Sequence, residues 1–150
     1  DKKGPLKNPA DRDHCLQYMV AASLLKGDLK AEYYEDDFAE NPLIDSLREK
    51  MVVLEDKAYS KSYLDPNERS IANAVQLIFK DYESEKVEVL YPIGHKNRRN
   101  EGIPELIKKY NTNIKRHYKG EKLKNILDFI QSYDQFSKMS ITDFMQLVAS

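Results

Sequence analysis

The chain has 150 residues and a mass of 17.5 kDa, with 41% hydrophobic and 33% charged residues. This length predicts one domain, or one domain with appended segments. The 24 basic and 25 acidic side chains leave a net charge of -1, which excludes a globally basic nucleic-acid-binding protein.

Two further classes are excluded by the composition. No apolar run approaches the roughly 20 residues of a membrane-spanning helix. The single cysteine, Cys15, excludes an intramolecular disulfide and a multi-cysteine metal cluster. We therefore expect a reducing compartment.

Charge is distributed unevenly along the chain. Residues 1–56 carry 8 basic and 13 acidic side chains, whereas residues 86–150 carry 12 basic and 7 acidic ones. Three interpretations stay open: the two parts attract each other, the basic part faces an anionic ligand, or the charges form ordinary solvated surface.

The first predicted helix has the clearest boundaries. Asn8 is a suitable N-cap, Pro9 suits the first helical position, and Gly27 suits the C-terminal stop. A shorter helix is expected over residues 30–38, and the pair Asn41-Pro42 begins a third helix.

The pattern then favours strands. Residues 51–54 form a short apolar, β-favouring run, and residues 56–69 are expected to form a loop. Alternating apolar side chains predict strands over residues 71–80 and 87–91, joined by a polar turn at residues 81–85. Three such strands suffice for a small sheet if helices cover one face.

The C-terminal part is predicted to be helical. Pro104 begins a helix that ends near His117, and another helix is expected over residues 121–133. Ser140 and Asp143 form a capping box for the last helix. The order of helices, strands and helices predicts an α+β fold: a small antiparallel sheet packed with helices, followed by C-terminal helices.

The first candidate for chemistry is a polar stripe on the first helix. Asp11, His14 and Tyr18 are three and four residues apart, which places them on one face of a continuous helix. An imidazole titrates near neutral pH and a phenol can donate to a developing oxyanion, so the two make a proton-handling pair. The alternative is a helix surface with a His–Tyr contact and no ligand.

The second candidate is the loop that holds His95, Lys96, Arg98 and Arg99. Its cations could bind carboxylates or phosphates, and arginine does so with two parallel hydrogen bonds. The alternative is an exposed, solvated turn. A nucleic-acid contact is disfavoured because no aromatic platform is interleaved with the charges.

No metal or nucleotide site is predicted. The nitrogen and sulfur ligands of note show no paired short spacing; they are His14, Cys15, His95 and His117. The chain contains no Gly-x-Gly-x-x-Gly motif, no P-loop and no Gly-x-Ser-x-Gly elbow. We therefore expect neither a metal nor another cofactor.

Two motifs carry a resemblance to a known family. The run from Gly4 to Val20, GPLKNPADRDHCLQYMV, and the Tyr-Pro-Ile-Gly-His loop at residues 91–95 resemble the C-terminal part of the MmgE/PrpD superfamily, and within it the 2-methylcitrate dehydratases. Further matches follow in chain order at residues 34–37, 44–50, 63–66, 69–74 and 101–104. The similarity weakens after about Lys115.

The resemblance implies that this chain is roughly the last third of a longer protein. The family has a large helical domain and a smaller α+β domain, with the active site in the cleft between them. Residues 1–103 would be an α+β domain portion and residues 104–150 a C-terminal helical segment. The N-terminal helical domain of the same protein would be the partner. Superfamily members are often homodimers, and the implied location is the cytoplasm, or the mitochondrial matrix in a eukaryote.

The implied reaction is the dehydration of 2-methylcitrate to 2-methylaconitate in the methylcitrate cycle of propionate catabolism, without an iron–sulfur cluster. The substrate is a small tricarboxylic acid. Tyr18 aligns with an active-site tyrosine of the superfamily, and His14 lies in the same motif as a second catalytic candidate. Arg12 would bind a substrate carboxylate or hold a partner acid. Substrate contacts of the basic loop are assigned from charge alone: His95, Arg98 and Arg99.

Other functions stay open. The superfamily also contains aconitate decarboxylases and epimerases of related acids, and a separate anion-binding or interaction module is a further alternative. The isolated chain is expected to be inactive as an enzyme, because it holds no complete acid–base set.

Overall fold

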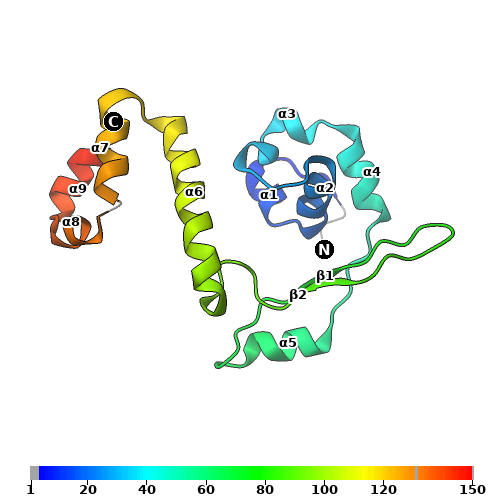
Figure 1. Ribbon diagram of the computed structural model, residues 1–150. Coiled ribbons are helices and arrows are strands. Elements are labelled where there is room, and N and C mark those ends of the chain that lie inside the picture. Colours follow the sequence, from blue (N-terminus) through cyan, green and yellow to red (C-terminus); the bar gives the residue numbers. More distant parts are fainter. Residues whose placement is uncertain (1–3, 131, 150) are drawn as a thin grey trace. The chain divides into compact units, whose positions relative to one another are not determined.

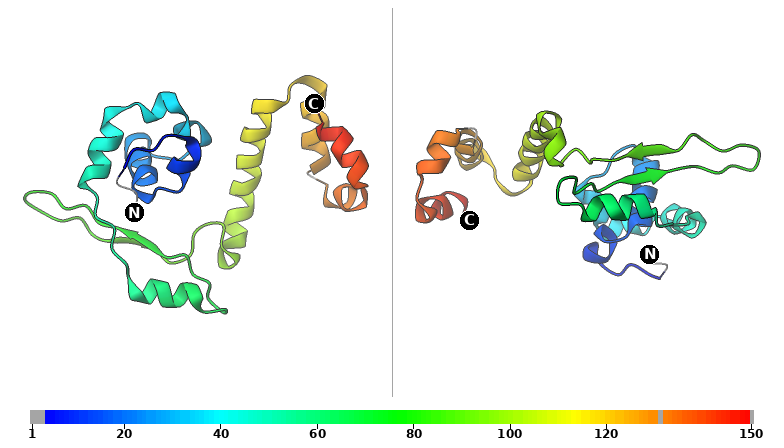
Figure 2. Two further views of the ribbon diagram at one scale, coloured as in Figure 1. Left: turned by 180° about the vertical axis from the view of Figure 1, so that it is seen from behind. Right: turned by 90° about the horizontal axis from the view of Figure 1, so that it is seen from below.

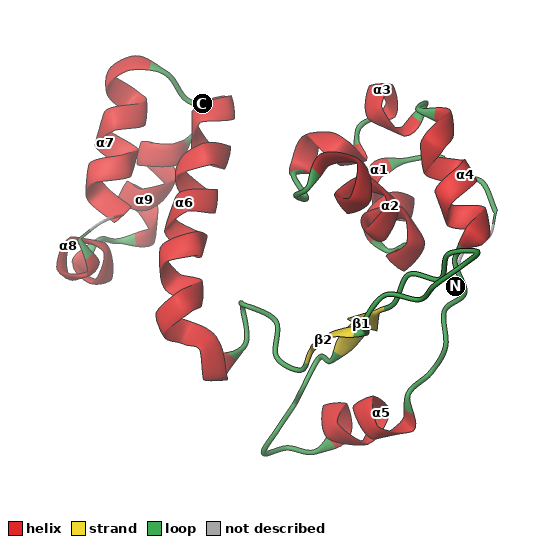
Figure 3. Ribbon diagram, turned by 45° about the vertical axis from the view of Figure 1, so that its right-hand side comes forward, coloured by secondary structure: helices red, strands yellow, loops and turns green. Residues whose placement is uncertain are grey.

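The structure is a computed structural model that describes residues 4–130 and 132–149. Helices dominate the described residues, and the strands are short (Figure 3). The predicted α+β class is therefore confirmed. The chain divides into two compact units, residues 1–57 and 58–150. The predicted domain boundary at residue 103 stays a prediction.

The first unit is helical, and three of its predicted capping residues are confirmed. Its elements are α1 (Pro9–Asp13), α2 (Leu16–Lys26), the 3-10 helix η1 (Ala31–Tyr34), α3 (Asp36–Ala39) and α4 (Pro42–Lys50) (Figure 1). Asn8 accepts a hydrogen bond from the Asp11 N–H at 2.9 Å, and Gly27 ends α2 in the left-handed conformation, φ 77°. Asn41 caps α4 in the same way.

The single helix predicted over residues 9–26 is wrong, because the chain breaks between α1 and α2. At the end of α1 the Cys15 N–H donates to the Arg12 carbonyl at 3.1 Å, which is three residues back instead of four. Cys15 itself is extended at φ -116°, ψ 105°, so α2 starts in a new direction. The His14 ring nitrogen Nδ1 lies 3.0 Å from the Ala10 carbonyl at this break.

The core of the first unit lies between α2 and α4. Its buried residues are Cys15, Tyr18, Ala21, Ala22 and Ile44. The small alanines let the two helices approach closely, and partly buried aromatic side chains of η1 and α3 pack around them. The short helix predicted over residues 30–38 is divided, because Glu35 is extended at ψ 160° between η1 and α3.

The second unit contains the sheet and the remaining helices. Its elements are α5 (Lys57–Leu64), β1 (Asn73–Val75), β2 (Val87–Val89), the 3-10 helix η2 (Lys96–Arg98), α6 (Arg99–His117), α7 (Gly120–Ile130), α8 (Tyr133–Lys138) and α9 (Ile141–Val148) (Figure 2). α5 starts at the last residue of the first unit. No helix in the described part of the chain is both long and apolar enough to cross a membrane.

The sheet is an antiparallel hairpin in which Asn73 pairs with Val89 and Val75 with Val87. A single bridge from Ile78 to Glu83 lies farther along the ribbon. The predicted strands over residues 71–80 and 87–91 are therefore shorter than expected, and residues 51–54 form no strand. Val75, Val87 and Val89 are all exposed, so burial of a sheet face contributes little to extending the ladder.

Residues 56–69 were expected to be a loop, but α5 occupies much of this segment. The sequence KAYSKSYL contains neither glycine nor proline, and Tyr59 and Tyr63 stand one turn apart. The helix ends directly before Asp65-Pro66, because a residue that precedes proline disfavours the helical conformation.

α6 begins at Arg99, five residues before the predicted start at Pro104, which lies inside the helix. Tyr118 and Lys119 separate the end of α6 from α7, whose first residue is Gly120, φ 58°. The last helix is confirmed with its capping box: the Asp143 N–H donates to the Ser140 hydroxyl at 3.1 Å. The helix predicted over residues 121–133 ends at Ile130, and α8 was not predicted.

Gly102 allows the first turns of α6 to approach the preceding loop. A Cβ atom at this position would lie 2.3 Å from the carbonyl oxygen of Ile93, which belongs to rigid backbone. Replacing glycine by alanine inside a helix normally stabilises by about 0.5–1 kcal/mol. Here we expect Gly102→Ala to destabilise by about 1–3 kcal/mol, the usual cost of overpacking.

Urea denaturation of the variant measures this effect. Gly94→Ala is the matched control, because an added Cβ there meets nothing within 4 Å. A Gly102→Ala protein as stable as the wild type would mean that the loop does not approach the helix closely.

Candidate functional site

Tyr18 lies on the inner face of α2, in the core of the first unit. It is 1% exposed, and its hydroxyl donates to the backbone carbonyl of Tyr33 at 2.6 Å. The Tyr34 ring stacks beside it, with centroids 6.1 Å apart. Burial raises the pKa of Tyr18, and the nearby Arg12 opposes that shift. The phenol is therefore protonated at neutral pH and acts as a hydrogen-bond donor.

Arg12 reaches the same turn from α1. Only 4% of the residue is exposed. One guanidinium nitrogen donates to the Tyr34 carbonyl at 2.6 Å, and another lies 2.7 Å from a carboxylate oxygen of Asp36. Arg12 and Tyr18 thus donate hydrogen bonds to consecutive backbone carbonyls, Arg12 to that of Tyr34 and Tyr18 to that of Tyr33.

His14 lies at the end of α1 and is exposed over 77% of its side chain. Its Nδ1 lies 2.5 Å from a carboxylate oxygen of Asp13 and 3.0 Å from the Ala10 carbonyl. Both partners are acceptors, so Nδ1 carries a proton. The prediction that His14 and Tyr18 share one helix face is wrong, because the break after α1 sends one outward and the other into the core.

His95 is buried in the second unit and forms hydrogen bonds to the backbone of two other residues. Its Nδ1 accepts the Asn97 N–H at 3.1 Å, so Nε2 carries the proton and donates to the Glu68 carbonyl at 3.0 Å. Its ring packs against Tyr91 with centroids 4.6 Å apart. Both ring nitrogens therefore hold the loop together in this structure.

The loop's cations divide between internal contacts and exposure. Arg98 forms two hydrogen bonds with the Glu101 carboxylate, at 3.2 and 2.8 Å, and a third with the Tyr91 carbonyl at 3.0 Å. Lys96 donates to the Asn67 carbonyl at 2.9 Å. Arg99 is exposed at the first position of α6. The loop that was expected to bind anions thus uses Lys96 and Arg98 for hydrogen bonds within its own unit, and Arg99 is exposed on its surface.

The Arg98–Glu101 pair makes the start of α6 sensitive to acid. Hydrogen bonds from Arg98 hold the pKa of Glu101 below its ordinary value of 4.5. The pair therefore stabilises the fold above pH 4.5, and this stability is lost as the pH falls through the folded pKa. We expect the carboxyl titration of Glu101, followed by NMR, to have a midpoint below 4.5, and Arg98→Gln to move that midpoint upward. An unmoved midpoint in Arg98→Gln would contradict this pairing.

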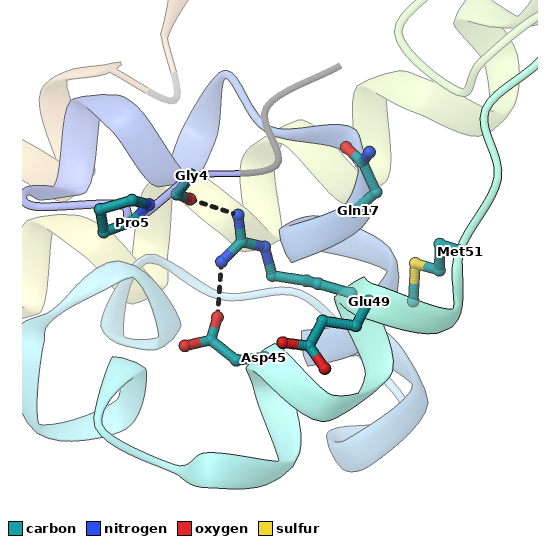
Figure 4. A pocket seen from close by; sticks show the side chains of 7 residues that line it. Gly4, Pro5, Gln17, Asp45, Glu49 and Met51 are labelled. Atoms are coloured by element: carbon teal, nitrogen blue, oxygen red, sulfur yellow. Dashed lines mark hydrogen bonds and ion pairs between the residues drawn. The ribbon is translucent and has the colours of Figure 1, made fainter.

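A pocket of about 330 Å³ opens in the first unit (Figure 4). It was missed at the level of sequence, because its lining comes from three separate segments: Gly4, Pro5, Gln17, Asp45, Arg48, Glu49 and Met51. The guanidinium of Arg48 binds Asp45 at 2.5 Å and donates to the Gly4 carbonyl at 3.0 Å. Because the carboxylates of Asp45 and Glu49 outnumber this single guanidinium, the pocket offers no excess of positive charge to a tricarboxylate.

Cys15 is a small buried residue, with its sulfur 3.6 Å from the amide oxygen of Gln17. Within residues 4–130 and 132–149, no three His, Cys, Asp or Glu side chains are grouped so that they could hold a metal ion.

The predicted site residues fall into two sets. Arg12, His14 and Tyr18 belong to the first unit, and the basic loop belongs to the second.

Comparison with known proteins places the chain in a family. The profile of the MmgE/PrpD C-terminal domain family matches residues 1–135. The 2-methylcitrate dehydratase of Escherichia coli (strain K12) is 47% identical over 148 residues, which cover 98% of this chain and 31% of that protein. The 2-methylcitrate dehydratase of Cupriavidus necator is 45% identical over 150 residues, with coverage of 99% and 31%.

A eukaryotic relative is almost as similar. The mitochondrial 2-methylcitrate dehydratase of Yarrowia lipolytica is 44% identical over 148 residues, which cover 98% of this chain and 28% of that protein. The chain thus spans about 31% of the length of the bacterial relatives. Because the profile covers most of its residues, the chain belongs to the MmgE/PrpD C-terminal domain family.

Proposed function

We propose that the full-length protein carrying this chain is a hydro-lyase that dehydrates 2-methylcitrate. The observation that supports this most strongly is the identity of 44–47% to curated 2-methylcitrate dehydratases across nearly the whole chain. The reaction removes a carbon-bound proton and a hydroxyl group, forms a carbon–carbon double bond and releases water. It needs a base, an acid for the leaving hydroxyl, and cations for three carboxylates.

Two residues of the first unit are proposed for the proton transfers. Tyr18 donates its proton to the leaving hydroxyl, since its phenol is protonated at neutral pH. His14 is proposed as the base, because its side chain is 77% exposed and an imidazole titrates near neutral pH. Tyr18 is 1% exposed in this structure, so its contact with substrate requires the turn at Tyr33 to release its hydroxyl.

Substrate carboxylates are proposed to meet the basic loop of the second unit. Arg99 is exposed and offers a planar guanidinium, which suits two-pronged carboxylate binding. The substrate contacts predicted for His95 and Arg98 stay predictions, because both already hold the loop through internal hydrogen bonds. The preceding part of the relatives' length is proposed to supply the other wall of the cleft.

The test uses the full-length protein and follows the unsaturated product by ultraviolet absorbance. We expect turnover of 2-methylcitrate and none of the related acids at a comparable rate. A panel with cis-aconitate and an epimerisable acid separates the alternatives. Decarboxylation or epimerisation without dehydration would keep the family but replace the proposed reaction.

A further inference from the structure

Arg12 and Tyr18 hold one turn of the first unit from two different helices. Arg12 extends from α1 and Tyr18 from α2, and each forms a 2.6 Å hydrogen bond to a carbonyl of η1. The two carbonyls, those of Tyr34 and Tyr33, are consecutive in the chain. The guanidinium therefore fixes the same turn that receives the phenol.

We infer that Arg12 is a positioning residue for Tyr18, and that it sets where the phenol hydroxyl points instead of binding substrate itself. The Arg12 side chain is 5% exposed. Its guanidinium forms a hydrogen bond to the Tyr34 carbonyl and an ion pair with Asp36. Both terminal nitrogens of the guanidinium are thus occupied by partners inside the first unit.

The electrostatics of the cluster support this role. A positive charge near a phenol favours the phenolate form, and Arg12 opposes the effect of burial on the Tyr18 pKa. Other groups act on the phenol too: Tyr34 and Asp45 raise its pKa, and Arg48 lowers it. If Tyr18 gives up its proton during dehydration, the guanidinium stabilises the anion that remains.

Lysine cannot replace arginine in this arrangement. The planar guanidinium donates in two directions at once, to a carbonyl and to a carboxylate, whereas an ammonium group is a compact charge on a flexible stem. Arg12→Lys keeps the charge but loses the bridge from Tyr34 to Asp36. Arg12→Gln removes both. Asp36→Asn keeps the guanidinium and removes the carboxylate, whose side chain is 74% exposed.

The catalytic part of this inference rests on the proposed function, so the experiment has two readouts on the full-length protein. The first is steady-state kinetics with 2-methylcitrate. We expect Arg12→Lys to lower kcat by about 100-fold, the scale of a misplaced catalytic group, while KM stays unchanged. A raised KM with kcat preserved would overturn the inference and make Arg12 a substrate ligand.

The second readout does not depend on turnover. 3-Fluorotyrosine incorporated at position 18 reports the ionisation of that phenol by ¹⁹F NMR. We expect Arg12→Gln to raise the pKa at position 18, and Arg12→Lys to shift the resonance with a smaller change in pKa. An unchanged resonance and titration in Arg12→Gln would overturn the inference, whether or not the wild type dehydrates 2-methylcitrate.

If the variants at Arg12 fail to fold, Asp36→Asn still tests the inference. Its substitution is on the surface, so circular dichroism is expected to match the wild type. The ¹⁹F resonance at position 18 is expected to move in the same direction as in Arg12→Lys, by less. No movement in a folded Asp36→Asn protein would show that the bridge does not position Tyr18.

Discussion

Replacing Tyr18 by phenylalanine is expected to lower kcat of the full-length protein by about 10²–10⁴-fold, the usual contribution of a positioned proton donor. The substitution removes one oxygen and leaves the ring, which fills the core between α2 and α4. The lost hydrogen bond to the Tyr33 carbonyl costs about 1–3 kcal/mol of stability at most, so the fold is retained.

Tyr34→Phe is the matched control for this experiment. Its ring stacks on Tyr18, but its hydroxyl has no part in the proposed chemistry. We expect activity close to that of the wild type. Steady-state kinetics and circular dichroism of the two variants separate chemistry from folding. Full activity in Tyr18→Phe would leave this phenol as a core residue whose hydroxyl serves only the turn at Tyr33.

Replacing Ile44 by alanine is expected to reduce the free energy of unfolding by about 2–5 kcal/mol. Ile44 is 1% exposed and is the buried residue of α4 in the core that it shares with α2. Truncation removes buried apolar atoms and leaves a cavity, because Ala21 and Ala22 on the facing helix are too small to fill it.

Leu43→Ala tests whether this loss belongs to the core. Leu43 is the preceding residue of α4 and is 54% exposed, so its truncation is expected to change stability by no more than about 0.5 kcal/mol. Urea denaturation followed by circular dichroism measures both variants. Equal losses for the two would mean that α4 does not pack through Ile44.

Helix ends that carry their own capping residue were the part of the fold that local sequence signals could predict. Asn8, Asn41 and Ser140 cap their helices through their own side chains, and Gly27 ends α2 in a conformation that glycine adopts readily. These interactions join residues two to four positions apart, so a single sequence contains all the information they need.

The break after α1 and the short sheet needed information that the pattern did not contain. The chain leaves the helical conformation at Cys15, φ -116°, ψ 105°, which no apolar period reveals. The apolar residues alternate along the sequence, but all three residues of β2 are exposed, so the length of the ladder was overestimated.

The candidate site was predicted by residue type but not by environment. The motif identified Arg12 and Tyr18, yet their partners lie 22 and 15 residues farther along the chain, in a turn that spacing alone does not place. The basic loop was predicted from charge, and its internal bonding to Glu101 and to the Tyr91 carbonyl appears only in three dimensions.

The central claim is that this chain supplies one part of an active site that the rest of the protein completes. The most direct measurement compares 2-methylcitrate turnover by the full-length protein with that by the 150-residue chain alone. The account predicts dehydration by the full-length protein and none by the isolated chain. Turnover by the isolated chain, or an inactive full-length protein that is folded, would contradict it.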